Sequence, residues 1–216
     1  IARRIVYGAL SLYALASIIV ALIPLLTLGV FPILSGNPTE RMERIASVTQ
    51  TTAMARFFAF AAAALAVIAV AIWVYFAVRN LDALETTSRP IGPTVAVTLC
   101  LVPVINLIGG PFVLYLLVSE SERAAGERAA WFRFEGSHLV AAWGVSLAAS
   151  LGLFGYVMLS FNAIDRLSDV SALFIVNVLV RAFDVALAGI TAMIVHRVGQ
   201  LQQEAYDKRD VAEVFE

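Results

Sequence analysis

Long apolar stretches separated by short polar clusters run along most of the chain. Five apolar segments stand out: Ile5–Leu34, Ala53–Val78, Thr94–Val118, Leu139–Ser160 and Ser171–Val195. A membrane-spanning helix needs about 20 mostly apolar residues, and every segment reaches that length. Peptide groups in hydrocarbon must be hydrogen-bonded within the protein, so the segments are predicted to be helices. The pattern therefore predicts an all-α integral membrane protein, a bundle of five hydrophobic helical segments.

The connectors between the segments are short. One transmembrane helical domain over residues 1–198 is therefore predicted, with no soluble domain. Residues 199–216 form a polar C-terminal tail, in which Gln200, Gln203, Glu204 and Lys208 recur at helical spacing. We expect this tail to extend the last helix into water.

The third segment, residues 94–118, contains residues that disrupt helices. Pro103, Asn106, Gly109, Gly110 and Pro111 fall close together at what should be membrane depth. Proline removes a backbone donor and clashes with the preceding turn, and glycine weakens a helix further. The segment is predicted to be broken or kinked near Pro103–Pro111. Two interpretations are open: one kinked helix that crosses the membrane, or a re-entrant segment that returns to the side from which it came.

The distribution of Lys and Arg bears on this choice, because cytoplasmic connectors carry an excess of both. If all five segments cross, the C-terminus is predicted to be cytoplasmic and the N-terminus outside. If the third segment re-enters, both termini are predicted to be cytoplasmic, with ten basic residues on that side and four on the other. The ten are Arg3, Arg4, Arg79, Arg89, Arg123, Arg128, Arg133, Arg197, Lys208 and Arg209, and the four are Arg41, Arg44, Arg56 and Arg166. Charge favours re-entry, segment length favours crossing, and both place the C-terminal tail in the cytoplasm.

Composition agrees with membrane residence and narrows the function. The chain is 61% hydrophobic and 14% charged, with a mean hydropathy of +0.87, whereas soluble domains carry about a quarter charged residues. The formal net charge of −1 gives no support for a nucleic-acid partner. The predicted partners are the lipid bilayer and other membrane protein subunits. The single cysteine, Cys100, lies within an apolar run, so neither a disulfide nor a thiol metal site is predicted.

The strongest candidate site is a polar face in the fifth segment. Asn177, Arg181 and Asp184 lie at i, i+4 and i+7, which places them on one side of a helix. A charge at mid-membrane costs about 2.5–3.5 kcal/mol on insertion scales, so such residues face the protein interior and are paired. Two interpretations follow: a site for an ion, a proton or a headgroup, or an internal ion pair that fixes the rotation of the helix.

The two histidines indicate a weaker candidate site. His138 opens the fourth segment and His196 closes the fifth, so an antiparallel pair of these helices would bring both imidazoles to one membrane level. Such a pair suits a b-type haem or another tetrapyrrole, whereas histidine at the headgroup boundary is commonly just a polar interfacial residue. No other cofactor and no metal site is predicted. The sequence has no G-x-S-x-G, H-E-x-x-H or P-loop motif, so an enzyme is not predicted.

Two motifs and the end of the last helix carry a resemblance to a known family. The residues involved are Trp73-Val74-Tyr75 with Ala77, Asn80 and Leu81; then Pro103, Asn106, Leu107 and Pro111; and finally Arg197, Gln200 and Gln203. Together they resemble a bacterial membrane family catalogued as domain of unknown function 4328, although Phe76 stands where that family usually has Arg. The resemblance implies a multi-helix protein of the bacterial inner (cytoplasmic) membrane and no established activity.

The motif asparagines are given structural roles. Asn80 is expected to cap carbonyls where the second helix ends, and Asn106 to satisfy backbone groups freed by the prolines. With no catalytic motif, the first hypothesis is a non-enzymatic multi-pass membrane protein, an accessory or scaffold subunit of a larger complex. The alternative is a small transporter or channel that uses the polar face of the fifth segment. The second alternative is a haem-binding electron carrier.

Overall fold

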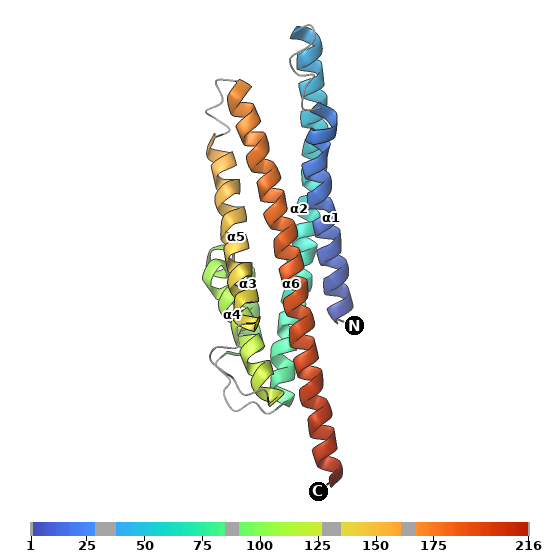
Figure 1. The fold of residues 1–216 in the computed structure, drawn as a ribbon, viewed down its shortest axis with the longest axis vertical. Coiled ribbons are helices and arrows are strands. Elements are labelled where there is room, and N and C mark those ends of the chain that lie inside the picture. The colour runs from blue at the N-terminus through green and yellow to red at the C-terminus, as the bar shows by residue number, and fades with distance from the viewer. Residues whose placement is uncertain (1, 29–37, 85–90, 127–134, 161–166, 216) are drawn as a thin grey trace.

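The computed structural model describes residues 2–28, 38–84, 91–126, 135–160 and 167–215 of the chain. Within these ranges every regular element is a helix, which confirms the predicted all-α class. The helices are α1 (Ala2–Leu28), α2 (Pro38–Ala83), α3 (Pro93–Leu101), α4 (Pro103–Ala124), α5 (Glu135–Ser160) and α6 (Leu167–Phe215). As expected, α6 continues through most of the polar tail, and it projects beyond the other helices at the C-terminal end (Figure 1).

Four helices, not five, are long and apolar enough to cross a membrane in the described part of the chain. The apolar spans are Ala2–Ile23, Gln50–Ala83, His138–Leu159 and Ile175–Arg209, which belong to α1, α2, α5 and α6. Large apolar side chains point outward along them, such as Phe60, which is 76% exposed, and Leu159, which is 82% exposed. Since exposed apolar surface on this scale is stable only in hydrocarbon, the bundle has the surface of a multi-pass membrane protein.

The third predicted segment is not one continuous spanning helix, because it breaks at Val102. Proline at position 103 has no backbone N–H to donate and pushes the preceding residue away from helical angles. Val102 accordingly adopts φ −77° and ψ 114°, so α3 ends before it and α4 begins after it. The predicted break is confirmed, and it lies at the first edge of the predicted stretch. Pro111 remains inside α4.

The two short helices fold back on each other as a re-entrant hairpin. A Cβ atom built on Gly109 would lie 3.0 Å from both the Cβ and the carbonyl oxygen of Leu99. In a continuous helix these residues would be about 15 Å apart along the axis. The nine residues of α3 cover only about 14 Å, about half of the hydrocarbon core. The expectation of a fifth continuous spanning helix is therefore wrong, and the chain turns back at Val102, as the re-entrant interpretation expects.

The hairpin determines how the other helices are arranged. α1 packs on α2 and α6, α5 packs on α6 and α4, and α3 packs on α2. In Figure 1 the hairpin occupies the lower half of the bundle, on the side where α2 ends, α5 begins and both termini lie. We call this end the C-terminal side and the other end the distal side. Residues 29–34, which belong to the first predicted segment, lie outside the described residues.

Candidate functional site

Asp184 forms a buried ion pair within α6. Its carboxylate Oδ2 lies 2.8 Å from the Arg181 guanidinium, and the side chains of Arg181 and Asp184 are only 16% and 7% exposed. The spacing of i and i+3 puts both groups on one face of the helix, as the sequence indicated. Each charge therefore has the partner that membrane depth requires.

Two neighbouring helices add hydrogen bonds to the same carboxylate. The Ser150 hydroxyl of α5 donates to Asp184 Oδ1 at 2.7 Å. The Tyr13 hydroxyl of α1 also hydrogen-bonds to this carboxylate. Asp184 on α6 thus has polar contacts with both α1 and α5, in addition to the apolar packing between these helices.

A second guanidinium lies at the same level on α2. Hydrogen bonds between α2 and α6 join residues separated by 122, 125 and 126 positions, which fixes the parallel register of the two helices. In this register Arg56 lies beside the turn of α6 that contains Arg181, and the two positive charges interact electrostatically. The Nε atom of Arg181 is buried and has no hydrogen-bond partner among the described residues.

Asn177, the third residue of the predicted polar face, is also buried, at 8% exposure. It lies one turn distal to Arg181 and, by the same register, level with Thr52 of α2. Thr52 is 7% exposed, and its hydroxyl has no hydrogen-bond partner within the described ranges. The structure therefore places all three predicted residues inside the bundle, within a larger polar cluster than the sequence indicated.

The cluster adjoins a cavity of about 260 Å³ that is lined by residues from all six helices. Its polar groups come from Tyr13, Cys100, Asn106, Trp143, Ser150, Asp184 and Thr191, and the rest of the wall is apolar or glycine. At ~30 Å³ per water molecule, this space equals about eight waters or a similar number of methylene groups. A mostly apolar cavity with a few fixed polar groups is the usual form of a small-molecule site.

Trp143 forms part of the cavity wall and is fixed by a hydrogen bond. Its indole Nε1–H donates to the Thr191 hydroxyl at 2.9 Å, and that hydroxyl donates to the Leu187 carbonyl at 2.7 Å. Gly110 of α4 allows the ring to approach, since a Cβ at this position would lie 3.0 Å from the indole. The indole therefore reports on the inside of the cavity.

A separate polar network connects α2, α4 and α6 near the C-terminal side. The side-chain amide of Asn80 donates to Gln202 Oε1 at 3.2 Å, while Gln202 Nε2 donates to the Ala77 carbonyl at 3.0 Å and to the Ser121 hydroxyl at 3.4 Å. α2 continues to Ala83, so the expectation that Asn80 caps the end of this helix is wrong. Its side chain instead connects two helices.

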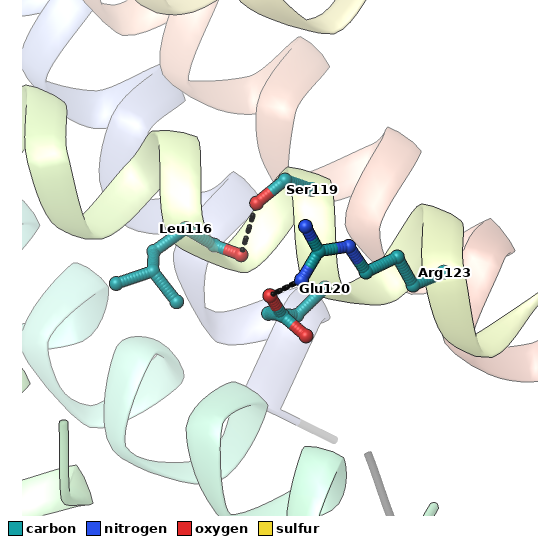
Figure 2. A network of polar contacts seen from close by, with 4 residues as sticks. All are labelled: Leu116, Ser119, Glu120 and Arg123. Carbon is teal, nitrogen blue, oxygen red and sulfur yellow. Dashed lines mark hydrogen bonds and ion pairs between the residues drawn. The ribbon is translucent and has the colours of Figure 1, made fainter. Parts of the chain in front are cut away.

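The C-terminal extension of α6 caps two other helices. Lys208 donates to the Ala125 carbonyl just after α4, and Arg209 donates to the Ala83 carbonyl at the end of α2 at 2.8 Å. Cations at helix C-termini satisfy free carbonyls and the negative end of the dipole. The final turns of α4 also hold an Arg123–Glu120 ion pair of 2.7 Å and a hydrogen bond from Ser119 to the Leu116 carbonyl, both drawn in Figure 2.

The two histidines lie level with each other but on the surface. Trp143 lies opposite Thr191 and Ser150 opposite Asp184, so the same antiparallel register puts His138 opposite His196. Both side chains belong to exposed residues. No group of three or more His, Cys, Asp or Glu residues suitable for a metal occurs in the part of the chain that the structure describes. Haem ligation by these two residues stays a prediction.

The remaining motif residues have structural positions. Trp73 and Leu81 are buried in the core at 4% and 7% exposure, whereas Leu107 is 44% exposed on the outer face of α4. Pro103 starts α4, Asn106 lines the cavity, and Pro111 contacts Gly144 of α5. These residues shape the hairpin and its attachment to the bundle.

Sequence reasoning missed Tyr13, Arg56, Ser150 and Gln202. Arg56 was counted only as a topology charge, although an arginine inside an apolar run indicates a polar partner. Tyr13 and Ser150 carry no periodic signal, and only the helix register brings them to Asp184.

Comparison with known proteins gives a family and no activity. The family model described as "Domain of unknown function (DUF4328)" matches residues 38–200, from the first residue of α2 into α6. No curated protein and no solved structure matches the chain. The matched region contains Arg56, the hairpin, Ser150, Arg181 and Asp184, whereas Tyr13 lies outside it.

Proposed function

Since the chain belongs to the DUF4328 family, whose description assigns no activity, we propose that it is a non-catalytic membrane protein that binds a small, largely apolar molecule within the bilayer. The observation that carries this proposal is the cavity of about 260 Å³ beside Asp184. Packed protein interiors leave few spaces larger than a water molecule, so a cavity of this size in a small bundle indicates a ligand.

The fluorescence of Trp143 provides the test, in a Trp73→Phe/Trp131→Phe background that leaves it as the single indole of the chain. The neutral probe 8-bromooctan-1-ol suits the cavity volume of about 260 Å³, and its bromine quenches a nearby indole. Titration of the purified protein in phosphatidylcholine nanodiscs is expected to give saturable quenching. Ala66→Leu fills the cavity from α2 and is expected to weaken binding at least tenfold, whereas Ala64→Leu, an exposed residue outside the cavity, is the matched control. Equal quenching of both variants and the wild type would refute a cavity site.

Transport is the form of this function that the hairpin favours. Interrupted helices at mid-membrane depth occur where backbone lines a cavity or a substrate path, and here the hairpin residues Asn106 and Gly110 line the cavity. Asp184→Asn with Arg181 retained is then expected to abolish flux in proteoliposomes. If proton, Na⁺, K⁺ and Cl⁻ fluxes equal those of protein-free liposomes, the hypothesis of ion transport is rejected, and the proposal of a binding site in the cavity is unaffected.

An accessory or scaffold role is the second candidate function, and α6 is the feature that favours it. This helix projects past the bundle on the C-terminal side, where its exposed residues include Gln203, Glu204 and Asp207. Such an arm offers a surface to other membrane protein subunits. Mild detergent extraction is expected to retain a stoichiometric partner that is lost when Glu204 and Asp207 are both replaced by Lys. A monodisperse lone monomer would count against this role.

We place the C-terminal side in the cytoplasm, by the following argument. With a re-entrant hairpin, both termini and the connectors at 85–90 and 127–134 belong to one side, which then carries ten of the 15 Lys and Arg residues against four on the distal side. Arg181 is the remaining one. By the positive-inside rule the side with the excess is cytoplasmic. In the bacterial inner membrane the distal cluster then faces the outer leaflet.

A further inference from the structure

The polar cluster at the distal end of the cavity carries an excess of positive charge. Arg56 and Arg181 lie at one level and interact electrostatically, and Asp184 supplies the carboxylate at that level within the described helices. Glu43 is 13 residues before Arg56 on α2, about 20 Å along the axis. On α6, Asp169 lies at least nine residues, about 14 Å, on the distal side of the position that the helix register puts level with Arg56. Two guanidiniums thus share one carboxylate.

Three other groups already bond to this carboxylate. They are Arg181, Ser150 and Tyr13, and no hydrogen bond from Arg56 to Asp184 occurs among the described residues, so one negative charge is left to balance two guanidiniums. Two buried donors, Arg181 Nε at this level and the Thr52 hydroxyl one turn distal to it, have no acceptor in the described residues. Buried donors are nearly always paired in native proteins, so unpaired ones beside an uncompensated cation indicate a missing acceptor of negative charge.

The cavity lies directly next to this charge. It follows α6 from Thr191 to Asp184, and Arg181 is the next turn in the distal direction. Its walls below Asp184 are mostly apolar, with side chains such as Leu10, Leu114 and Leu147. Arg56 and Arg181 do not line the cavity themselves but lie just beyond Asp184 at its distal end. An apolar space with two guanidiniums beyond one end is complementary to a molecule with an acid group and a hydrocarbon chain.

We propose that the protein binds an anionic amphiphile, with the acid group at Arg56 and Arg181 and one acyl chain in the cavity. The proposal rests on the cavity function given above and names its ligand class. The volume admits about eight methylene groups, so one chain enters and a second chain stays outside. Arg56 is exposed on the outer surface of α2, which lets the acid group arrive from the bilayer.

The test compares two probes that share one brominated chain and differ in the head group, a charged carboxylate or a neutral hydroxyl. In phosphatidylcholine nanodiscs at pH 8, 8-bromooctanoate is expected to quench Trp143 with an affinity at least tenfold higher than 8-bromooctan-1-ol, after correction for partitioning. Arg56→Gln is expected to remove this preference, and Arg56→Lys, which retains the charge, is expected to retain most of it. Arg79→Gln is the matched control, because Arg79 is an exposed arginine on the same helix at its opposite end.

A second arm separates the two sources of such a ligand. Brominated phosphatidylglycerol replaces the free acid, with brominated phosphatidylcholine as the neutral-headgroup comparison. Quenching by 8-bromooctanoate that is stronger than by the alcohol and depends on Arg56 supports the proposal and identifies a free fatty acid as the ligand. Quenching by brominated phosphatidylglycerol that is stronger than by brominated phosphatidylcholine and depends on Arg56 supports it and identifies a membrane lipid.

The outcomes also separate this proposal from the function on which it rests. Equal affinities for the acid and the alcohol, together with unchanged binding by Arg56→Gln, would overturn the anionic ligand and leave a neutral cavity site. Absence of saturable quenching by every probe in the wild-type protein would overturn both.

Discussion

Replacement of Asp184 by Asn is expected to be the most damaging isosteric change in the bundle. The substitution keeps the shape of the side chain and removes its charge, so Arg181 would remain 16% exposed in the membrane interior without a counter-ion. Removing one partner of a buried ion pair costs about 3–5 kcal/mol, because the other charge stays buried. Since stability totals only about 5–15 kcal/mol, this loss is a large part of it.

The companion variants separate the contributions. Ser150→Ala deletes the 2.7 Å hydrogen bond to the carboxylate and is expected to cost about 1.5–3 kcal/mol, the range for a bond to a charged group. The double variant Arg181→Gln/Asp184→Asn removes both charges and leaves two neutral amides. It is expected to be more stable than Asp184→Asn alone by about 2 kcal/mol, because no unpaired charge stays buried.

The assay is SDS-titrated unfolding in mixed micelles, followed by far-UV circular dichroism. Glu204→Gln is the matched control, because it makes the same kind of change at an exposed position of α6 and is expected to alter stability by less than about 0.5 kcal/mol. If Asp184→Asn unfolds at the same SDS fraction as the wild type, or the double variant is no better than the single one, the ion pair does not stabilise the bundle and the reasoning fails.

Two further predictions concern the C-terminal side of the bundle. Gln202→Ala removes a side chain whose acceptor and donor groups bond to α2 and α4. The free energy of unfolding is expected to fall by about 1–3 kcal/mol in the same assay. Gln203→Ala is the control, because Gln203 is exposed and its change is expected to be close to neutral. The re-entrant hairpin predicts that cysteines placed at Gly92 and Arg123, in a Cys100→Ser background, react with an impermeant maleimide from the same side of the membrane. Labelling of the two positions from opposite sides would show that the third segment crosses.

The sequence predicted the fold class well because the bilayer imposes its requirements locally. Each of the four crossing helices satisfies its own backbone and exposes its own apolar side chains, so hydropathy alone located them. The fate of the third segment was not decided by local properties. Its length was sufficient for crossing, and only the conformation of Val102 and the contact of Gly109 with Leu99 show that it turns back. The excess of Lys and Arg was the one sequence signal that favoured the observed hairpin.

The candidate site shows the same division. Arg181 and Asp184 could be recognised because two charges at i and i+3 are rare inside an apolar run. Ser150 and Tyr13 could not, since a hydroxyl in a membrane helix costs little and needs no visible partner in the sequence. Their role depends on the register between α1, α5 and α6, which one sequence does not contain.

The two polar clusters of the bundle differ in a way that separates structural stabilisation from ligand binding. In the cluster around Gln202, the amide uses its acceptor on Asn80 and its donors on Ala77 and Ser121, so no group is left for a ligand. The cluster around Asp184 has the opposite balance, because Arg56 lacks a carboxylate of its own and Arg181 Nε lacks an acceptor among the described residues. A fully paired network gains nothing from binding a ligand, whereas an incompletely paired one beside an apolar cavity gains both charge neutralisation and buried apolar surface. The unsatisfied cluster is therefore where function is to be sought, and the half-depth hairpin is what leaves room beside it.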